Sequence, residues 1–339
     1  MDRDSATRGE VLLALLPLLL GVLGLVLAYV MPDDTPSGYA AQTVMSSAFP
    51  WLMAAWPFWG LGMLHFRMVP VSVGCVSLAG VGLAGCPPLL PGPRIAGAYV
   101  VAADVNADGN RTDAMVAHLA SIEADAIITF EQRGGRIPGM IPIASSDEGT
   151  PPERAATVHC RADLEPGRCT AQISTPIGSQ TRPMPVALLR MDTVCVLGAH
   201  APAPYPHSPT DTRDYVLAIA ERINNGQLAA AWGPCQAGDP VVVSGNLNAA
   251  PGSPLLRALR ATGLRDRLRF TGVHTTSWPG GGDFVAFPMI RLDHLLAAPA
   301  ARADYVERVY VPGSDHRGLL IHLRAKSQVP MRKTRSPGG

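Results

Sequence analysis

The apolar residues of this chain fall into two patterns, long uncharged runs at the front and short alternating segments behind them. The long runs cover 11–30, 46–64 and 69–90. Each is close in length to the ~20 residues that a membrane-spanning helix requires. The first run alone would also suit a signal peptide, but two further runs follow it. We therefore predict that residues 1–90 form a membrane anchor of three transmembrane helices.

The few charged residues near these runs predict the orientation of the anchor. Arg3, Arg8 and Arg67 lie on one side of the predicted spans, whereas the loop 31–43 carries acidic residues and no Lys or Arg. Basic residues favour the cytoplasmic side of a membrane. The N-terminus is therefore expected in the cytoplasm, and everything after Leu90 is expected outside it.

Residues 91–324 show the mixed periodicity of an α+β domain. A strand is predicted at 98–105, an amphipathic helix at 112–122, and a buried strand at 124–132, followed by a Gly/Pro-rich loop at 133–153. The same reasoning predicts further strands at 157–160, 170–174, 186–191, 193–200, from Val241, at 289–296 and after Arg317, and helices at 212–224 and from Pro254. Asn225-Gly226 is expected to end the first of those helices. Residues 325–339 are expected to form a disordered basic tail.

The stretch from Val241 onward is the most informative. A β-branched run ends at Gly245 and opens into a loop that carries Asn246 and Asn248. Ser253 then suits a helix N-cap, with Pro254 at the first helical position. Polar residues at the tip of a buried strand are typical of active sites, although Asn residues also supply ordinary turn geometry.

Two Asp-His pairs follow this stretch and carry a family resemblance. Leu292-Asp293-His294 lies in a predicted strand, and Ser314-Asp315-His316 lies in a turn before the last strand. With Asn246-x-Asn248 before them, these motifs resemble the endonuclease/exonuclease/phosphatase superfamily of metal-dependent phosphoesterases. The resemblance implies a four-layer α/β/β/α sandwich. The layout with three membrane spans is similar to bacterial proteins related to the teicoplanin-resistance protein VanJ, and this resemblance implies a role in antibiotic resistance.

The resemblance also implies a metal site. Glu131, at the end of a buried strand, matches the metal-binding Glu of the superfamily, and Asp315 would help to bind or position the metal. Oxygen ligands of this kind suit Mg²⁺, or alternatively Mn²⁺. Asp104 stands where the superfamily has a strand-end Asn.

Phosphate binding and catalysis would fall to a second group of residues. By resemblance, His316 touches the phosphate or acts as a base, and Asp293 orients it. Asn248 and His200 would donate to phosphate oxygens, although His200 would equally suit an ordinary loop position. His294 is expected to be structural, because successive side chains of a strand point to opposite faces. The motif Thr276-Ser277-Trp278-Pro279 resembles a Thr-Trp-Pro motif of the superfamily. Trp278 would either stack on the substrate or pack beneath the site.

One position departs from the family pattern. The superfamily usually has Gly-Asp-x-Asn at this strand end, and here an amide, Asn246, replaces the Asp. Since Asp104 replaces an Asn, we hypothesise that the two positions have exchanged roles. The alternative is a degraded site in a domain that only binds or senses phosphate ligands.

Charge and composition narrow the range of substrates to be expected. The net charge of the 339-residue chain is +1, and only 16% of its residues are charged. No Lys/Arg stripe is present, so a nuclease is the less favoured enzyme and no stable nucleic-acid partner is expected. A phosphoesterase tethered outside the membrane would meet lipid-linked phosphates or pyrophosphates, which are the substrates we expect.

Cysteine usage suits an oxidising compartment. Four cysteines lie in the predicted outer domain. Cys160 and Cys169 flank a turn and are expected to staple a hairpin. Cys195 and Cys235 would then pair by elimination, unless Cys195 is a buried free thiol.

Overall fold

The structure is a computed structural model that describes Leu19 and residues 99–106, 113–131, 135–204, 208–249, 251, 253–268, 277 and 291–324. Within these residues, none of the helices has the length and apolar character needed to cross a membrane. The predicted spans 11–30, 46–64 and 69–90 lie outside the described residues, apart from Leu19, and so does the predicted tail.

The first sheet has six strands in the order β13-β14-β1-β2-β4-β3. Its strands are β1 (Tyr99–Asn106), β2 (Ala126–Phe130), β3 (Met140–Ser145), β4 (Ala156–Arg161), β13 (Arg302–Tyr310) and β14 (Arg317–Arg324). Within this sheet, β1 and β2 are the only described strands that pair in parallel, as expected for two strands joined by a helical crossover. That crossover contains α4 (Asp113–Ser121), whose Met115 and Leu119 pack on the outer face of the sheet with Ile127 and Leu320.

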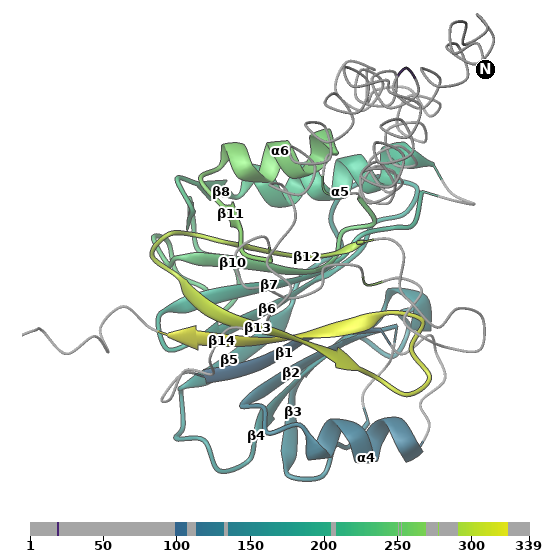
Figure 1. Cartoon of the computed structure of the whole chain (residues 1–339), viewed down its shortest axis with the longest axis vertical. Coiled ribbons are helices and arrows are strands. Elements are labelled where there is room, and N and C mark those ends of the chain that lie inside the picture. Colours follow the sequence, from purple (N-terminus) through teal and green to yellow (C-terminus); the bar gives the residue numbers. More distant parts are fainter. Residues whose placement is uncertain are drawn as a thin grey trace, which may run out of the picture.

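The second sheet has six strands in the order β11-β12-β10-β7-β6-β5. Its strands are β5 (Cys169–Ile173), β6 (Val186–Met191), β7 (Val194–His200), β10 (Val241–Asn246), β11 (Arg265–Asp266) and β12 (Asp293–Ala297). The helices α5 (Pro209–Glu221) and α6 (Pro254–Ala261) cover its outer face, opposite the side that carries α4 (Figure 1). Helix α6 begins as predicted, with Ser253 as N-cap and Pro254 at the first helical position. Helix α5 begins three residues before the predicted start at 212, with the same pattern of Ser208 followed by Pro209.

The main hydrophobic core lies between the two sheets. The strands that form it are apolar on the inward face, and the buried cluster joins both sheets through residues such as Ile128, Val158, Ile321, Leu188, Val196 and Val243. Helix, sheet, sheet and helix therefore follow one another as four layers (Figure 1), which confirms the predicted fold. Burial on this scale supplies most of the stability of such a sandwich.

Several elements differ from the sequence prediction. The segment predicted as the loop 133–153 contains β3, an edge strand that tolerates Pro142 because its outer side needs no ladder hydrogen bond. The long strand β13 was not predicted. Asn225 and Gly226, both with positive φ, form the turn between β8 (Ile223–Asn224) and β9 (Gln227–Leu228), so the helix before them already ends at Glu221.

Both expected disulfides are present, but one has a different role. Cys160 lies in β4 of the first sheet and Cys169 in β5 of the second, so their disulfide joins the two sheets and does not staple a hairpin. The prediction of a hairpin was wrong because consecutive strands here pair with different neighbours. Cys195 and Cys235 are also bonded, which excludes the free-thiol alternative.

Candidate active site

Three neighbouring strands of the second sheet begin or end at the candidate site. His200 is the last residue of β7 and Asn246 the last residue of β10, and the two are opposite each other in parallel register. Asp293, the first residue of β12, is opposite Asn246 on its other side. The strand order therefore brings together three residues that are far apart in the sequence.

The first sheet contributes Glu131 and His316 to the same end of the sandwich. Glu131 directly follows β2, and His316 directly precedes β14. The backbone of Glu131 has a φ of 55°, in the left-handed region that non-glycine residues rarely adopt. Its N–H donates to the carbonyl of Ala155, which holds this conformation. Such backbone geometry is common at functional sites, where the surrounding structure enforces it.

His316 and Asp293 form a buried dyad across the two sheets. The Nδ1–H of His316 donates to Oδ2 of Asp293 at 2.8 Å, and both side chains are almost fully buried. Burial lowers the pKa of His316, but the charge and hydrogen bond of Asp293 outweigh it, so the pKa is raised. A carboxylate in this position fixes the tautomer of the imidazole and leaves Nε2 as the reactive nitrogen.

Asn246 faces that reactive nitrogen. Its Oδ1 accepts the backbone N–H of Asn248 at 2.8 Å, which fixes the orientation of the amide. The Nδ2 group therefore points to Nε2 of His316, at 3.4 Å. Since an amide NH₂ is only a donor, this contact favours an unprotonated Nε2, opposing the effect of Asp293.

Asn248 also has left-handed backbone geometry, with a φ of 47°. Its side-chain NH₂ donates to the carbonyl of Ala201 at 2.7 Å, which ties the loop after β10 to the end of β7. One amide hydrogen is thus already engaged. That the other donates to a phosphate oxygen stays a prediction.

His200 connects the two sheets on the other side of the site. Its Nε2 lies 3.2 Å from Oε1 of Glu131, and its ring stacks on Phe130. Its backbone N–H donates to the hydroxyl of Tyr215, which in turn donates to the carbonyl of Pro185. Burial raises the pKa of Tyr215, so this hydroxyl stays protonated and keeps both bonds. The structure therefore places His200 in the site and not in a free loop.

His294 has a structural role, as the sequence predicted. Its Nε2–H donates to the carbonyl of Ala249, and its Nδ1 accepts from Arg291 at 3.2–3.3 Å. Burial and the charge of Arg291 lower the pKa of His294 to about 3. The ring is therefore neutral and unavailable for proton transfer at ordinary pH.

Ser277 is a supporting residue whose role the sequence did not reveal. Its buried Oγ accepts the backbone N–H groups of both Leu292 and Asp293, and its carbonyl accepts the N–H of Arg317. Ser277 thus fixes the start of β12 beside the start of β14, the two points that carry the dyad. The neighbouring Trp278 lies outside the described residues.

The remaining predicted residues lie around this centre. Asp104 belongs to β1, at an irregularity in its pairing with β2, and its side chain lies outside what the structure describes. Strand β1 ends at Asn106, opposite Phe130, so an amide residue does stand at the end of this strand. The sequence reasoning overlooked Asn106. Asp315 is exposed beside His316, and its charge contributes to the raised pKa of that histidine.

The residues present suit a hard cation that keeps much of its water. Within the described part of the chain, no three His, Cys, Asp or Glu side chains form a closed metal cluster. Mg²⁺ commonly takes only one or two carboxylates and completes its shell with water and phosphate. Glu131 offers a carboxylate, and Oδ1 of Asp293 is buried without a hydrogen-bond partner among the described residues. The donor set is therefore compatible with such an ion.

A two-sheet sandwich with an Asp–His dyad, a carboxylate and amides at one end defines a class of phosphoester hydrolases. The chain belongs to the Endonuclease/Exonuclease/phosphatase family, whose sequence profile matches residues 103–316. Members of the family are hydrolases that act on phosphoester bonds, and they generally use divalent metals such as Mg²⁺.

Solved structures share the fold. The AP endonuclease LMAP from Leishmania major is similar with a TM-score of 0.54 and 10% identity, covering 71% of this chain and 93% of that one. Sphingomyelinase C from Streptomyces griseocarneus has a TM-score of 0.43 and 15% identity, covering 67% of this chain and 99% of that one. At these identities the likeness concerns the fold alone. No curated protein matches the chain.

Proposed function

We propose that this protein is a membrane-anchored, metal-dependent phosphoesterase that acts outside the cytoplasm on a phosphate or pyrophosphate ester, such as a lipid-linked one. The observation that carries the proposal is the meeting of five side chains at one end of the sandwich. Glu131 contacts His200, and His316 contacts both Asn246 and Asp293. The two groups are adjacent because His200 and Asn246 are opposite each other in neighbouring strands.

The proposed chemistry divides between a metal and the dyad. Glu131 would hold Mg²⁺, with Asp104 and Asp315 as further ligands, and the ion would neutralise phosphate charge and activate water. Asp293 holds the imidazole of His316 through Nδ1, so a proton is bound or released at Nε2. His200 and Asn248 would position phosphate oxygens.

The proposed location rests on two supports. The uncharged runs in 1–90 predict an anchor, and the charge pattern predicts an outer domain beyond it. The disulfides Cys160–Cys169 and Cys195–Cys235 are typical of proteins that fold in an oxidising compartment.

A phosphate-release screen of the full chain tests the proposal. Lipid pyrophosphates, nucleotides and DNA would be offered with Mg²⁺ or Mn²⁺, and the His316→Gln variant would serve as the inactive reference. We expect release from a phosphate or pyrophosphate ester that depends on the metal and on His316. Equal release by the wild type and by His316→Gln would contradict it. Activity unaffected by Asp104→Asn would separately reject the exchange of roles between Asp104 and Asn246.

A second candidate is a phosphate-binding or sensing domain without turnover, and the orientation of Asn246 favours it. Its NH₂ group faces His316 where the family usually has a carboxylate. Binding of Mg²⁺ or Mn²⁺ and phosphate ligands without product release would support this candidate.

A further inference from the structure

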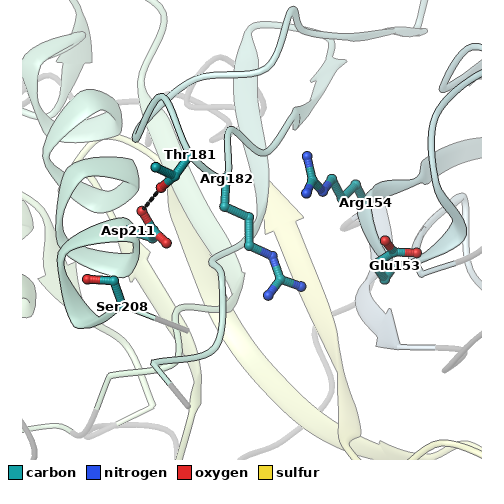
Figure 2. Close-up of a pocket in the computed structure, with 6 residues that line it drawn as sticks. All are labelled: Glu153, Arg154, Thr181, Arg182, Ser208 and Asp211. Carbon is teal, nitrogen blue, oxygen red and sulfur yellow. Dashed lines mark hydrogen bonds between the residues drawn. The ribbon is translucent and has the colours of Figure 1, made fainter. Parts of the chain in front are cut away.

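A pocket of about 570 Å³ lies beside the candidate active site and has no role in the chemistry described above. The short helix η1 (Pro152–Arg154), the β5–β6 loop and the start of α5 form its walls (Figure 2). Six residues line it: Glu153, Arg154, Thr181, Arg182, Ser208 and Asp211.

Backbone contacts place this pocket next to the Glu131–His200 side of the site. Arg154 directly precedes Ala155, whose carbonyl accepts the N–H of Glu131 at 2.9 Å. The loop that carries Arg182 leads into β6, whose first residue is opposite the neighbour of His200 in β7. The negative charge of Glu131 also acts on Arg182, where it raises the pKa of the guanidinium group.

Two arginines extend toward each other across the pocket (Figure 2). Figure 2 shows the guanidinium groups of Arg154 and Arg182 pointing into the same space from opposite walls. The Nε of Arg154 and the Nε and Nη1 of Arg182 are buried and have no hydrogen-bond partner among the described residues. Burial and the neighbouring charge of Arg154 lower the pKa of Arg182. Buried donors that lack an acceptor destabilise a fold, so the arrangement calls for an anion.

The acidic residues of the pocket do not supply that anion. Asp211 accepts a hydrogen bond from the hydroxyl of Thr181 at 2.6 Å, and Glu153 lies beyond Arg154 on the side remote from Arg182 (Figure 2). Both carboxylates act on Arg182 only through their charge, which raises its pKa against the larger effect of burial, and no ion pair joins them to either arginine among the described residues. Arginine forks bind phosphate oxygens with matching planar geometry.

We infer that this pocket binds a second phosphoryl group of the substrate, so that the protein acts on diphosphate-bearing molecules in preference to monophosphates. The inference rests on the proposed function, because the first phosphoryl group occupies the centre at Glu131, His200 and His316. Arg154 and Arg182 hold the second group on the adjoining side. The same chemistry would accept a membrane-linked diphosphate or a soluble one.

Matched substrates test the inference with the full chain in detergent. Geranyl monophosphate and geranyl diphosphate differ by one phosphoryl group, and methyl monophosphate and methyl diphosphate form the pair without a lipid tail. The variants are Arg154→Gln, Arg182→Gln and the charge-retaining Arg182→Lys. The control is Arg213→Gln, which removes an arginine of α5 that does not line the pocket.

We expect each Gln variant to lower kcat/KM for the diphosphates by about tenfold or more, while kcat/KM for the monophosphates changes by less than about twofold. Arg182→Lys should lose less than Arg182→Gln, and the control should match the wild type. If kcat/KM falls equally for geranyl diphosphate and methyl diphosphate, the substrate would be a soluble diphosphate. If it falls for geranyl diphosphate alone, the substrate would be a membrane-linked diphosphate. Equal losses on monophosphates and diphosphates, or none, would overturn the inference.

Calorimetry separates this inference from the proposed function. Methylenediphosphonate, which resists hydrolysis, should bind the wild type in the presence of Mg²⁺ and bind each Gln variant at least about tenfold more weakly. If methylenediphosphonate binds in this way but none of the hydrolysable substrates releases phosphate, the proposed hydrolase activity would be rejected and the diphosphate site would stand. Absence of binding to a folded wild type would reject the site itself.

Discussion

The substitution Asn246→Asp would place a second carboxylate beside the imidazole of His316. It restores the carboxylate that the family usually has, with almost the same shape as the amide. One oxygen would keep the hydrogen bond from the N–H of Asn248, and the other would face Nε2 of His316 at 3.4 Å in place of an NH₂ group. We expect the pKa of His316 to rise above its already raised value.

The size of the rise follows from that distance. A unit charge 3.4 Å from Nε2 interacts with about 5 kcal/mol at an effective dielectric constant of about 20. At ~1.4 kcal/mol per pH unit this sets a limit of roughly 3.5 units. The new charge is shared by two oxygens and hydrogen-bonded to the backbone, so a rise of about 1–3 units is expected. Because the folded pKa lies above the unfolded one, the added stability is fully present below about pH 6.5. It is lost as the pH rises through the folded pKa.

The assay is an NMR titration of the His316 imidazole in ¹³C-histidine-labelled protein without metal, with His316→Gln used to assign the signal. The part of the pH–rate profile that follows the protonation of His316 should move to higher pH by a similar amount. Asn224→Asp, an exposed substitution of the same chemistry in β8, is the control. An unchanged or lowered pKa in Asn246→Asp would refute the proposed orientation of the amide.

Three further predictions concern residues that support the site. Gly245→Ala should prevent stable folding, because its Cβ would lie 1.9 Å from the carbonyl oxygen of Ala199, whereas Gly149→Ala, with open space around it and no positive φ, should retain a cooperative melting transition. Ser277→Ala leaves two backbone N–H groups without their acceptor, so urea unfolding should show a loss of about 1–3 kcal/mol, and a loss below ~0.5 kcal/mol would count against its role. His294 has a folded pKa of about 3, so only the unfolded state takes up its proton between about pH 6.5 and 3, and the fold loses stability as the pH falls through that window. His294→Gln should therefore show a smaller stability difference between pH 7 and pH 5 than the wild type, by about 2 kcal/mol, and an equal difference would contradict the assignment.

Strand order explains which parts of the site the sequence could predict. The motifs around Asn246, Asp293 and His316 are local, so their strand-end positions could be predicted from residue patterns and from the family resemblance. Their pairwise contacts depend on β10 lying between β7 and β12, which no local pattern contains. The orientation of Asn246 depends on a single backbone N–H, that of Asn248.

The features that the sequence did not predict can each be explained by their local sequence or strand pairing. Strand β3 is exposed at a sheet edge and contains Pro142, so its sequence lacks the apolar alternation of a half-buried strand. The role of Ser277 was hidden because a serine that accepts distant backbone N–H groups has the same sequence signal as any loop serine. The hairpin expected around Cys160 and Cys169 failed because proximity in sequence does not determine which sheet a strand joins.

The Cys160–Cys169 disulfide links the two sheets covalently at the end of the sandwich that lies away from the candidate active site. Cys160 is opposite the first residue of β2, whereas Glu131 follows its last, so the covalent link lies roughly 16 Å from the catalytic end. At that far end a covalent bond joins the sheets, whereas at the catalytic end non-covalent contacts such as those of His316 with Asp293 and of Glu131 with His200 join them. Reduction of this disulfide would therefore remove the covalent link between the sheets at a distance from the catalytic groups, and it would loosen the sandwich from the end opposite the active site.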